Sequence, residues 1–140
     1  MSRKTILVAD DERHITHILS FKLKQVGVSV LAAEDGQEAL SLARKHHPDL
    51  VITDFQMPVL DGFELCVQLR ENAATAEIPV VLLTARGHKI PPRDLRRTNI
   101  QCIIAKPFSA RELLSNIEEL LGTRFIEQAD PSPNPQAALL

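Results

Sequence analysis

Residues 51–65 read VITDFQMPVLDGFEL, and this stretch holds the transition that decides the fold. It opens with Val51, Ile52 and Thr53, which are apolar or β-branched residues typical of a buried strand. The run stops abruptly at Asp54, and apolar residues at helical spacing begin at Phe63. An aspartate directly after a buried strand can be a turn residue, a metal ligand or a nucleophile. The rest of the chain decides among these three interpretations.

Short apolar runs alternate with helical patterns along most of the chain. The runs are rich in Val, Ile and Leu and predict strands at 5–9, 28–32, 50–53, 80–83 and 100–104. Apolar residues at helical spacing predict helices at 15–26, 39–43, 63–69 and 113–121, and a weaker pattern lies at 93–98. Five strands alternating with five helices predict an α/β domain on a parallel sheet. Right-handed crossovers should place helices on both faces of that sheet.

Glycine, serine and proline residues predict where several of these helices begin or end. Gly27 is expected to cap the first helix at its C-terminus, and Ser109 to cap the last one at its N-terminus. Pro91 and Pro92 can only begin the fourth helix. We expect that helix to end at Asn99, in a left-handed conformation.

The composition is that of an ordinary globular protein and argues against several functions. The chain has 140 residues, of which 44% are hydrophobic, and a net charge of −2, which gives no reason to expect binding to nucleic acid or to anionic membranes. Five Phe and no Trp or Tyr make a base-stacking surface unexpected. The N-terminal apolar run is too short for a signal peptide, and no run is long enough to cross a bilayer. We therefore expect a cytoplasmic protein with buried, reduced thiols at Cys66 and Cys102.

Residues 1–122 are expected to form one domain, because a chain of this length suits a single core. Residues 123–140 include the stretch EQADPSPNPQAALL, which is rich in Pro, Ala, Ser and Asn and has no long apolar face. We expect this segment to be a C-terminal tail that is largely disordered.

Polar residues follow four of the predicted strands at the points where the strands end. Asp10 and Asp11 follow the first, Asp54 the third, Thr84 the fourth and Lys106 the fifth. In open parallel sheets, ligands bind beyond the carboxyl ends of the strands. The sequence thus predicts three carboxylates, a hydroxyl and an ammonium group at one edge of the sheet.

Such a cluster of carboxylates needs a cation. Two carboxylates about 4 Å apart repel each other by roughly 4 kcal/mol at an effective dielectric constant of 20. Oxygen ligands open to water favour hard divalent ions, so we expect Mg²⁺, with Mn²⁺ as a substitute. Together with Lys106, this ion would attract a phosphoryl group, to which Thr84 would donate a hydrogen bond. Asp54 would then be the nucleophile.

Four motifs carry a resemblance to a known family: VADDE (8–12), DFQMPVLDG (54–62), LLTA (82–85) and AKPF (105–108). The sequence resembles the receiver domain of bacterial two-component response regulators over about residues 3–122, and the spacing between the motifs matches as well. The resemblance implies a flavodoxin-like (βα)5 fold with strand order 2-1-3-4-5. It also implies that Met57–Pro58 and Asp61–Gly62 shape the loop that presents Asp54.

The resemblance assigns roles to individual residues. Asp54 would accept a phosphoryl group from a phosphohistidine, carried by a sensor histidine kinase or a histidine phosphotransfer protein. Asp11 and Asp54 would bind Mg²⁺ directly, joined by the backbone carbonyl of Gln56, while Asp10 would act mainly through water.

The same resemblance places Thr84 and Lys106 against the phosphoryl oxygens and implies a cis bond between Lys106 and Pro107. The protein would be a switch rather than an enzyme, because it would catalyse only its own phosphorylation and dephosphorylation. Its output would pass through an unidentified partner protein, or through onward transfer of the phosphoryl group.

The sequence departs from the family pattern in the region of the fourth helix and fifth strand. Ile103 stands where the family has an aromatic residue, which turns inward during activation, so that form of coupling is not expected here. We expect Ile103 to face outward, as part of a partner-binding patch or as a single exposed apolar residue. Pro91 and Pro92 replace a typical helical start, and RDLRR adds three arginines, either as a solvated face or as a docking surface for an acidic partner. Arg86, with Gln56, stands at a position that tunes phosphoaspartate lifetime in the family.

Two alternatives use the same residues differently. A haloacid-dehalogenase-type phosphatase would need a second aspartate two residues after the nucleophile, where this chain has Gln56. A receiver-like interaction module that is no longer phosphorylated would not need the acidic and lysine residues that are present. The histidines at 14, 17, 46 and 47 are expected on the surface or at helix ends rather than at a zinc site.

Overall fold

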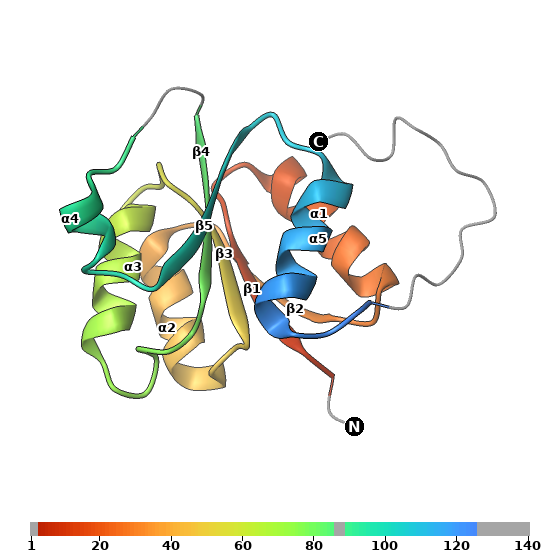
Figure 1. Ribbon diagram of the computed structural model, residues 1–140, viewed down its shortest axis with the longest axis horizontal. Coiled ribbons are helices and arrows are strands. Elements are labelled where there is room, and N and C mark those ends of the chain that lie inside the picture. The colour runs from red at the N-terminus through yellow and green to blue at the C-terminus, as the bar shows by residue number, and fades with distance from the viewer. Residues whose placement is uncertain (1–2, 86–88, 126–140) are drawn as a thin grey trace.

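The computed structural model describes residues 3–85 and 89–125. Its five strands form one parallel sheet in the order β2-β1-β3-β4-β5 (Figure 1). The strands are β1 (Thr5–Ala9), β2 (Ser29–Ala33), β3 (Leu50–Asp54), β4 (Val80–Ala85) and β5 (Ile100–Lys106). The helices are α1 (Arg13–Gln25), α2 (Gly36–His46), α3 (Gly62–Glu71), α4 (Pro92–Leu95) and α5 (Ala110–Leu121). This confirms the predicted (βα)5 fold and its strand order.

Helices cover both faces of the sheet, with α1 and α5 on one side and α2 and α3 on the other (Figure 1). The central strands β1 and β3 send alternate side chains into the two layers, as the period of a strand requires. Ile6, Val8 and Ile52 pack with α1 and α5, whereas Leu7 and Val51 pack with α2 and α3. Burial on both faces explains why these strands are nearly continuous in apolar residues.

Polar caps and left-handed residues bound the longer helices. The Asp61 carboxylate accepts a hydrogen bond from the Glu64 amide at 2.8 Å and thereby begins α3. Ser109 accepts from the Glu112 amide at 3.4 Å at the start of α5, which confirms the predicted cap. Gly27 follows α1 with a φ of +86°, in the left-handed conformation expected there.

The sequence prediction was wrong about the fourth helix. Helix α4 is a single turn, not a helix over 93–98. After Leu95 the chain tightens, because the Thr98 hydroxyl donates to the Leu95 carbonyl at 2.8 Å and the Thr98 amide bonds the same carbonyl at 3.0 Å. Asn99 is not left-handed; within the described residues that conformation occurs, apart from glycines, at His47 and Val59.

Other differences are smaller. Strand β2 lies one residue later than predicted, and β3, β4 and β5 extend one or two residues further than their apolar runs. Cys66 is buried, and burial raises the pKa of its thiol. Cys102 is only half-buried, contrary to expectation; both cysteines are free.

Two predictions about the ends of the chain and its environment meet the structure only in part. Most of the proposed tail, residues 126–140, lies outside the described residues, so its disorder stays a prediction. None of the helices in the described part of the chain combines the length and the apolar character needed to span a bilayer.

Candidate functional site

The sheet register brings the predicted polar residues to one edge. Strands β1 and β3 are neighbours with Ala9 opposite Thr53, so the residues that follow, Asp10 and Asp54, lie side by side. On the other side of β3, Asp54 is paired with Leu83 of β4, and Thr84 is the next residue. Parallel strands end at the same edge of a sheet, and this is why residues far apart in sequence meet here.

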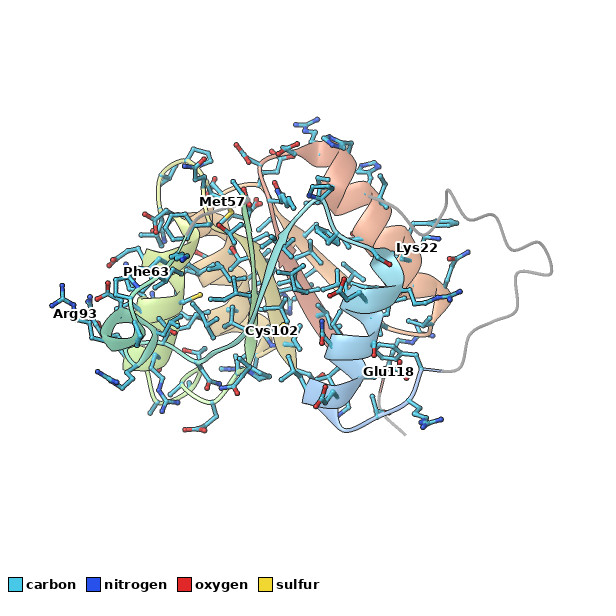
Figure 2. The ribbon with its side chains drawn as sticks, turned by 45° about the horizontal axis from the view of Figure 1, so that its top comes forward. Lys22, Met57, Phe63, Arg93, Cys102 and Glu118 are labelled. Carbon is cyan, nitrogen blue, oxygen red and sulfur yellow. The ribbon has the colours of Figure 1, made fainter. Side chains whose placement is uncertain are left out.

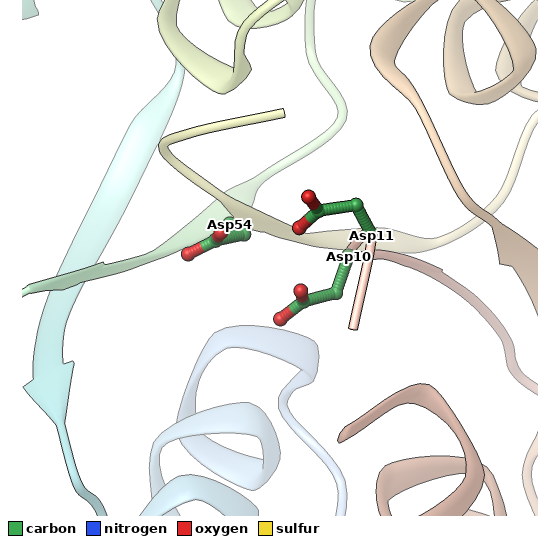
Figure 3. Close-up of side chains that lie close together, drawn as sticks. All are labelled: Asp10, Asp11 and Asp54. Atoms are coloured by element: carbon green, nitrogen blue, oxygen red, sulfur yellow. The ribbon is translucent and has the colours of Figure 1, made fainter. Parts of the chain in front are cut away.

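Asp10, Asp11 and Asp54 form a compact acidic cluster (Figure 3). Each offers one carboxylate oxygen, and these oxygens all lie within 4.8 Å of one another. Asp10 is fully buried and Asp54 is 8% exposed, whereas Asp11 faces solvent. One end of the cluster is therefore held inside the protein and the other is open to a ligand.

Lys106 bridges the two buried carboxylates. Its ammonium nitrogen lies 3.1 Å from Asp10 Oδ2, 3.1 Å from Asp54 Oδ1 and 3.7 Å from a Glu12 carboxylate oxygen. Partial burial acts to lower the pKa of Lys106, but its hydrogen bonds and charge attraction to Asp10 and Asp54 prevail and raise the pKa. Lys106 consequently carries its positive charge at neutral pH, beside both carboxylates.

The single positive charge of Lys106 does not neutralise the carboxylates at and around Asp54. Burial raises the pKa of the Asp54 carboxyl, the negative charge of Asp10 adds to this, and Lys106 opposes both. Three carboxylates facing one ammonium group leave net negative charge in a partly buried site. This donor set, made of carboxylate oxygens with one open side, fits a hard divalent cation such as Mg²⁺.

The loop after β3 forms the wall of a shallow pocket beside the acidic cluster. Gln56, Met57 and Pro58 line this pocket together with Asp11 and Asp61. The predicted metal ligand Gln56 thus lies in the same pocket as Asp11. That its backbone carbonyl binds Mg²⁺ stays a prediction.

Gly62 holds this loop closed at its far end. Its amide donates to the Phe55 carbonyl at 2.8 Å, and a Cβ atom at this position would collide with the Asp54 carbonyl. Only glycine lets the start of α3 pack this closely against the end of β3. This agrees with the structural role that the sequence suggested for Asp61–Gly62.

Thr84 and Pro107 complete the predicted site. Thr84 is 3% exposed, and among the described residues its hydroxyl makes one long hydrogen bond, 3.4 Å, to the Ala85 carbonyl. The hydroxyl can therefore turn to another acceptor at little cost. The Lys106–Pro107 peptide bond is cis, the isomer that the resemblance implies.

The residues that depart from the family pattern lie outside this cluster. Ile103 is 42% exposed on β5, whereas its neighbour Ile104 is buried, as strand alternation predicted. Pro91 is the N-cap of α4 and Pro92 its first residue. Arg86 lies outside the described residues, so its expected role stays a prediction.

Sequence reasoning missed one residue at the site, Glu12, and the backbone conformation of Val59 in the loop after β3. Glu12 reaches Lys106, and its only signal was its place directly after Asp10–Asp11. Val59 is 81% exposed and has a φ of +71°, which is strained for a β-branched residue. Its sequence position after Pro58 gave no indication of this conformation.

Comparison with known proteins agrees with the fold and the site. The chain matches the response regulator receiver domain family over residues 6–118 and therefore belongs to that family. Receiver domains act in two-component systems, together with histidine kinases and output proteins, and this chain carries the acidic pocket at the expected edge.

The curated relatives include longer proteins described as probable transcriptional regulators. The chain is 37% identical over 134 residues to a probable transcriptional regulator, ycf27, of Porphyridium aerugineum, covering 96% of this chain and 54% of the relative. It thus spans about half the length of the curated relatives that it matches.

Two solved structures illustrate the likeness of the fold. The chemotaxis response regulator CheY4 of Vibrio cholerae has a TM-score of 0.78 at 29% identity, covering 86% of this chain and 100% of that one. TrrA of Thermotoga maritima, solved in complex with Mg²⁺-BeF, has a TM-score of 0.75 at 32% identity, covering 84% and 99%.

Proposed function

We propose that this chain is a cytoplasmic signalling switch that accepts a phosphoryl group on Asp54, with Mg²⁺, and thereby changes its binding to an output protein. The observation that carries the proposal is the ammonium group of Lys106, placed 3.1 Å from both Asp10 and Asp54 beside an acidic cluster that fits a divalent ion. A turn residue would need none of these neighbours. A metal-binding residue would not need a lysine against the same carboxylate.

The donor would be a phosphohistidine on a sensor histidine kinase or a histidine phosphotransfer protein. An Asp54 carboxylate oxygen forms the new bond to phosphorus as the bond from phosphorus to the histidine nitrogen breaks. The electron pair of that broken bond stays on the imidazole, which takes up a proton. Because Asp54 is recessed, at 8% exposed, the donor group has to enter the pocket.

The residues around Asp54 would stabilise the phosphoryl oxygens. Lys106 already contacts the Asp54 carboxylate, so its charge lies where negative charge develops. The Thr84 hydroxyl, which is weakly held, would turn from the Ala85 carbonyl and donate to a phosphoryl oxygen. No general base is required, since Asp54 attacks as the carboxylate.

Asp11 and Asp54, with the Gln56 carbonyl, would hold Mg²⁺, and Asp10 would act through water; Mn²⁺ would serve as a substitute. When bound, the ion supplies further positive charge beside the phosphoryl group. The similarity to TrrA, solved in complex with Mg²⁺-BeF, supports this assignment. Such a protein turns over only its own phosphoaspartate and is not an enzyme for an external substrate.

The test uses acetyl phosphate as the donor. Wild type, Asp54→Asn and the matched control Asp94→Asn, which changes a carboxylate on α4, are incubated with and without Mg²⁺, and their intact masses are measured. We expect wild type and Asp94→Asn to gain one phosphoryl group only with the divalent ion, and Asp54→Asn to gain none. A gain that persists in Asp54→Asn, or no gain in wild type with either Mg²⁺ or Mn²⁺, would overturn the proposal.

The metal assignment has its own test. Mg²⁺ should raise the unfolding temperature of wild type, because an ion that binds only the folded state stabilises it. This shift should be much smaller in Asp11→Asn and unchanged in Asp94→Asn. Equal shifts in all three proteins would contradict the assignment of Asp11.

A further inference from the structure

Helix α4 is attached to the rest of the domain differently from the other helices. None of its four residues, all of which the structure describes, is buried. Each of the other four helices buries at least three residues in the core. Pro91 begins α4 without a side-chain cap. The position of α4 therefore depends on the contacts made by the residues next to it.

One such contact joins the turn after α4 to α3. The guanidinium carbon of Arg97 lies 5.8 Å from the centre of the Phe63 ring, within the range of a cation–π interaction. Phe63 belongs to the apolar residues that mark α3 in the sequence but is only half-buried, and Arg97 is exposed. Figure 2 shows Phe63 on the side of α3 next to α4, and Arg93 pointing away from the molecule.

Hydrogen bonds fix the backbone of the turn that carries Arg97. The Arg97 amide donates to the Asp94 carbonyl at 3.0 Å. The next residue, Thr98, is buried, and its hydroxyl accepts from the Ile100 amide at 3.2 Å while donating to the Leu95 carbonyl. The backbone at Arg97 is thus held at the point where α4 passes into β5.

On the α3 side, the contact lies close to the proposed phosphoryl acceptor, Asp54. Phe63 directly follows Gly62, whose Cα packs against the backbone carbonyl of Asp54 with no room for a Cβ. The Gly62 amide is also bonded to the Phe55 carbonyl. Because this junction is close-packed, a shift of the backbone at Asp54 would be passed on to Gly62 and Phe63.

We propose that the contact between Phe63 and Arg97 is a latch that links the phosphorylation state of Asp54 to the attachment of α4. Phosphorylation shifts the start of α3, weakens the contact and increases the population in which α4 is detached. This inference rests on the proposed function. It gives the chain a route from the pocket to the α4 region that does not require an aromatic ring at Ile103.

The test measures hydrogen exchange of the peptide that spans residues 89–99. Wild type, Phe63→Leu, Arg97→Gln and the double variant are compared with Arg96→Gln, which removes the same charge one residue away from the latch. Without phosphorylation, each single latch variant should exchange about two- to five-fold faster than wild type, the size expected for an exposed cation–π pair. Arg96→Gln should match wild type, and Arg97→Lys should retain part of the protection.

The double variant and treatment with acetyl phosphate then distinguish coupling between Asp54 and α4 from a general loosening of the α4 region. The double variant should exchange no faster than the faster single variant, because both changes remove one interaction. With acetyl phosphate and Mg²⁺, exchange of this peptide should rise in wild type and in Arg96→Gln but stay constant in the latch variants. Peptides from α2 and α5 report whether the fold as a whole has loosened.

Each contrary result has a distinct meaning. Latch variants that exchange like Arg96→Gln, or effects that add in the double variant, would overturn the latch. An equal response to phosphorylation in wild type and latch variants would overturn its coupling to Asp54. Intact mass, measured in the same samples, shows whether wild type carries a phosphoryl group. If it carries none, the proposed function and the coupling are overturned. The exchange rates of the unphosphorylated variants still decide whether the latch exists.

Discussion

Two regions of the molecule differ in how their residues are held in place. The first is the acidic pocket around Asp10, Asp11 and Asp54. The second is the α4–β5 face, which consists of α4, the turn at 96–99 and the outward side of β5. In the pocket, Asp10 and Asp54 are buried at the ends of the two central strands and share one ammonium group. On the α4–β5 face, no residue of α4 is fully buried and Ile103 is 42% exposed on an edge strand. Asp10 and Asp54 are thus fixed by the core, whereas α4 is fixed by a few contacts near the surface.

This difference suggests which parts of such a domain can change without loss of the acceptor chemistry. Moving Asp10 or Asp54 would disturb β1 or β3, which pack on both faces of the sheet, so the acceptor chemistry is tied to the fold. A change on the α4–β5 face disturbs little packing. We infer that the response to phosphorylation can be altered there while the acceptor chemistry is kept.

Substitution of Lys106 should produce the largest effect. Lys106→Met removes the charge that faces the developing phosphoryl negative charge, and we expect phosphorylation by acetyl phosphate to slow by roughly 100- to 1,000-fold. The matched control is Lys89→Met, an exposed lysine near α4. Initial rates from intact mass, with folding in Mg²⁺ checked by circular dichroism, provide the measurement. Similar rates for Lys106→Met and Lys89→Met would remove the distinction between the two regions.

A smaller effect is expected at the junction between the pocket and α3. Gly62→Ala introduces a Cβ against the Asp54 carbonyl and should lower the free energy of unfolding by about 1–3 kcal/mol. The control, Gly27→Ala, has open space around it and a left-handed φ, so it should lose only about 1 kcal/mol. Urea unfolding measures both. If Gly62→Ala were as stable as wild type, the close packing on which the coupling depends would be refuted.

The smallest effect should come from Ile103. Ile103→Ser alters an exposed side chain and should change stability by less than about 0.5 kcal/mol. Phosphorylation by acetyl phosphate should proceed at the wild-type rate. Its buried neighbour supplies the contrast, since Ile104→Ala should lose about 2–5 kcal/mol. A clear loss of phosphorylation in Ile103→Ser would mean that the α4–β5 face contributes to the acceptor chemistry after all.

The same contrast explains which features the sequence could predict. Asp10, Asp54 and Lys106 could be brought together from sequence because each directly follows an apolar run, and parallel strands end at a common edge. Ser109 was recognisable because it caps its own helix, whereas the structural role of Gly62 was implied by the family resemblance. These signals are local, and the topology of the sheet supplies the rest.

The features that were missed depend on contacts between segments. The length of α4 follows from the Thr98 hydroxyl bond to the Leu95 carbonyl, which competes with helix continuation. Phe63 has the spacing of a core residue, and only the position of the Arg97 turn shows that it serves a surface contact. The reach of Glu12 to Lys106 likewise depends on where β5 ends beside β4 and where the first loop turns.

The most direct test of the central claim locates the phosphoryl group. Protein treated with acetyl phosphate and Mg²⁺ is reduced with borohydride, which converts an aspartyl phosphate to homoserine, and the product is digested and sequenced by mass spectrometry. We predict homoserine at position 54, in the peptide that contains DFQMPVLDG. Homoserine at position 10 or 11 with an intact Asp54, or a phosphoryl group that resists reduction, would contradict the assignment of Asp54 as the acceptor.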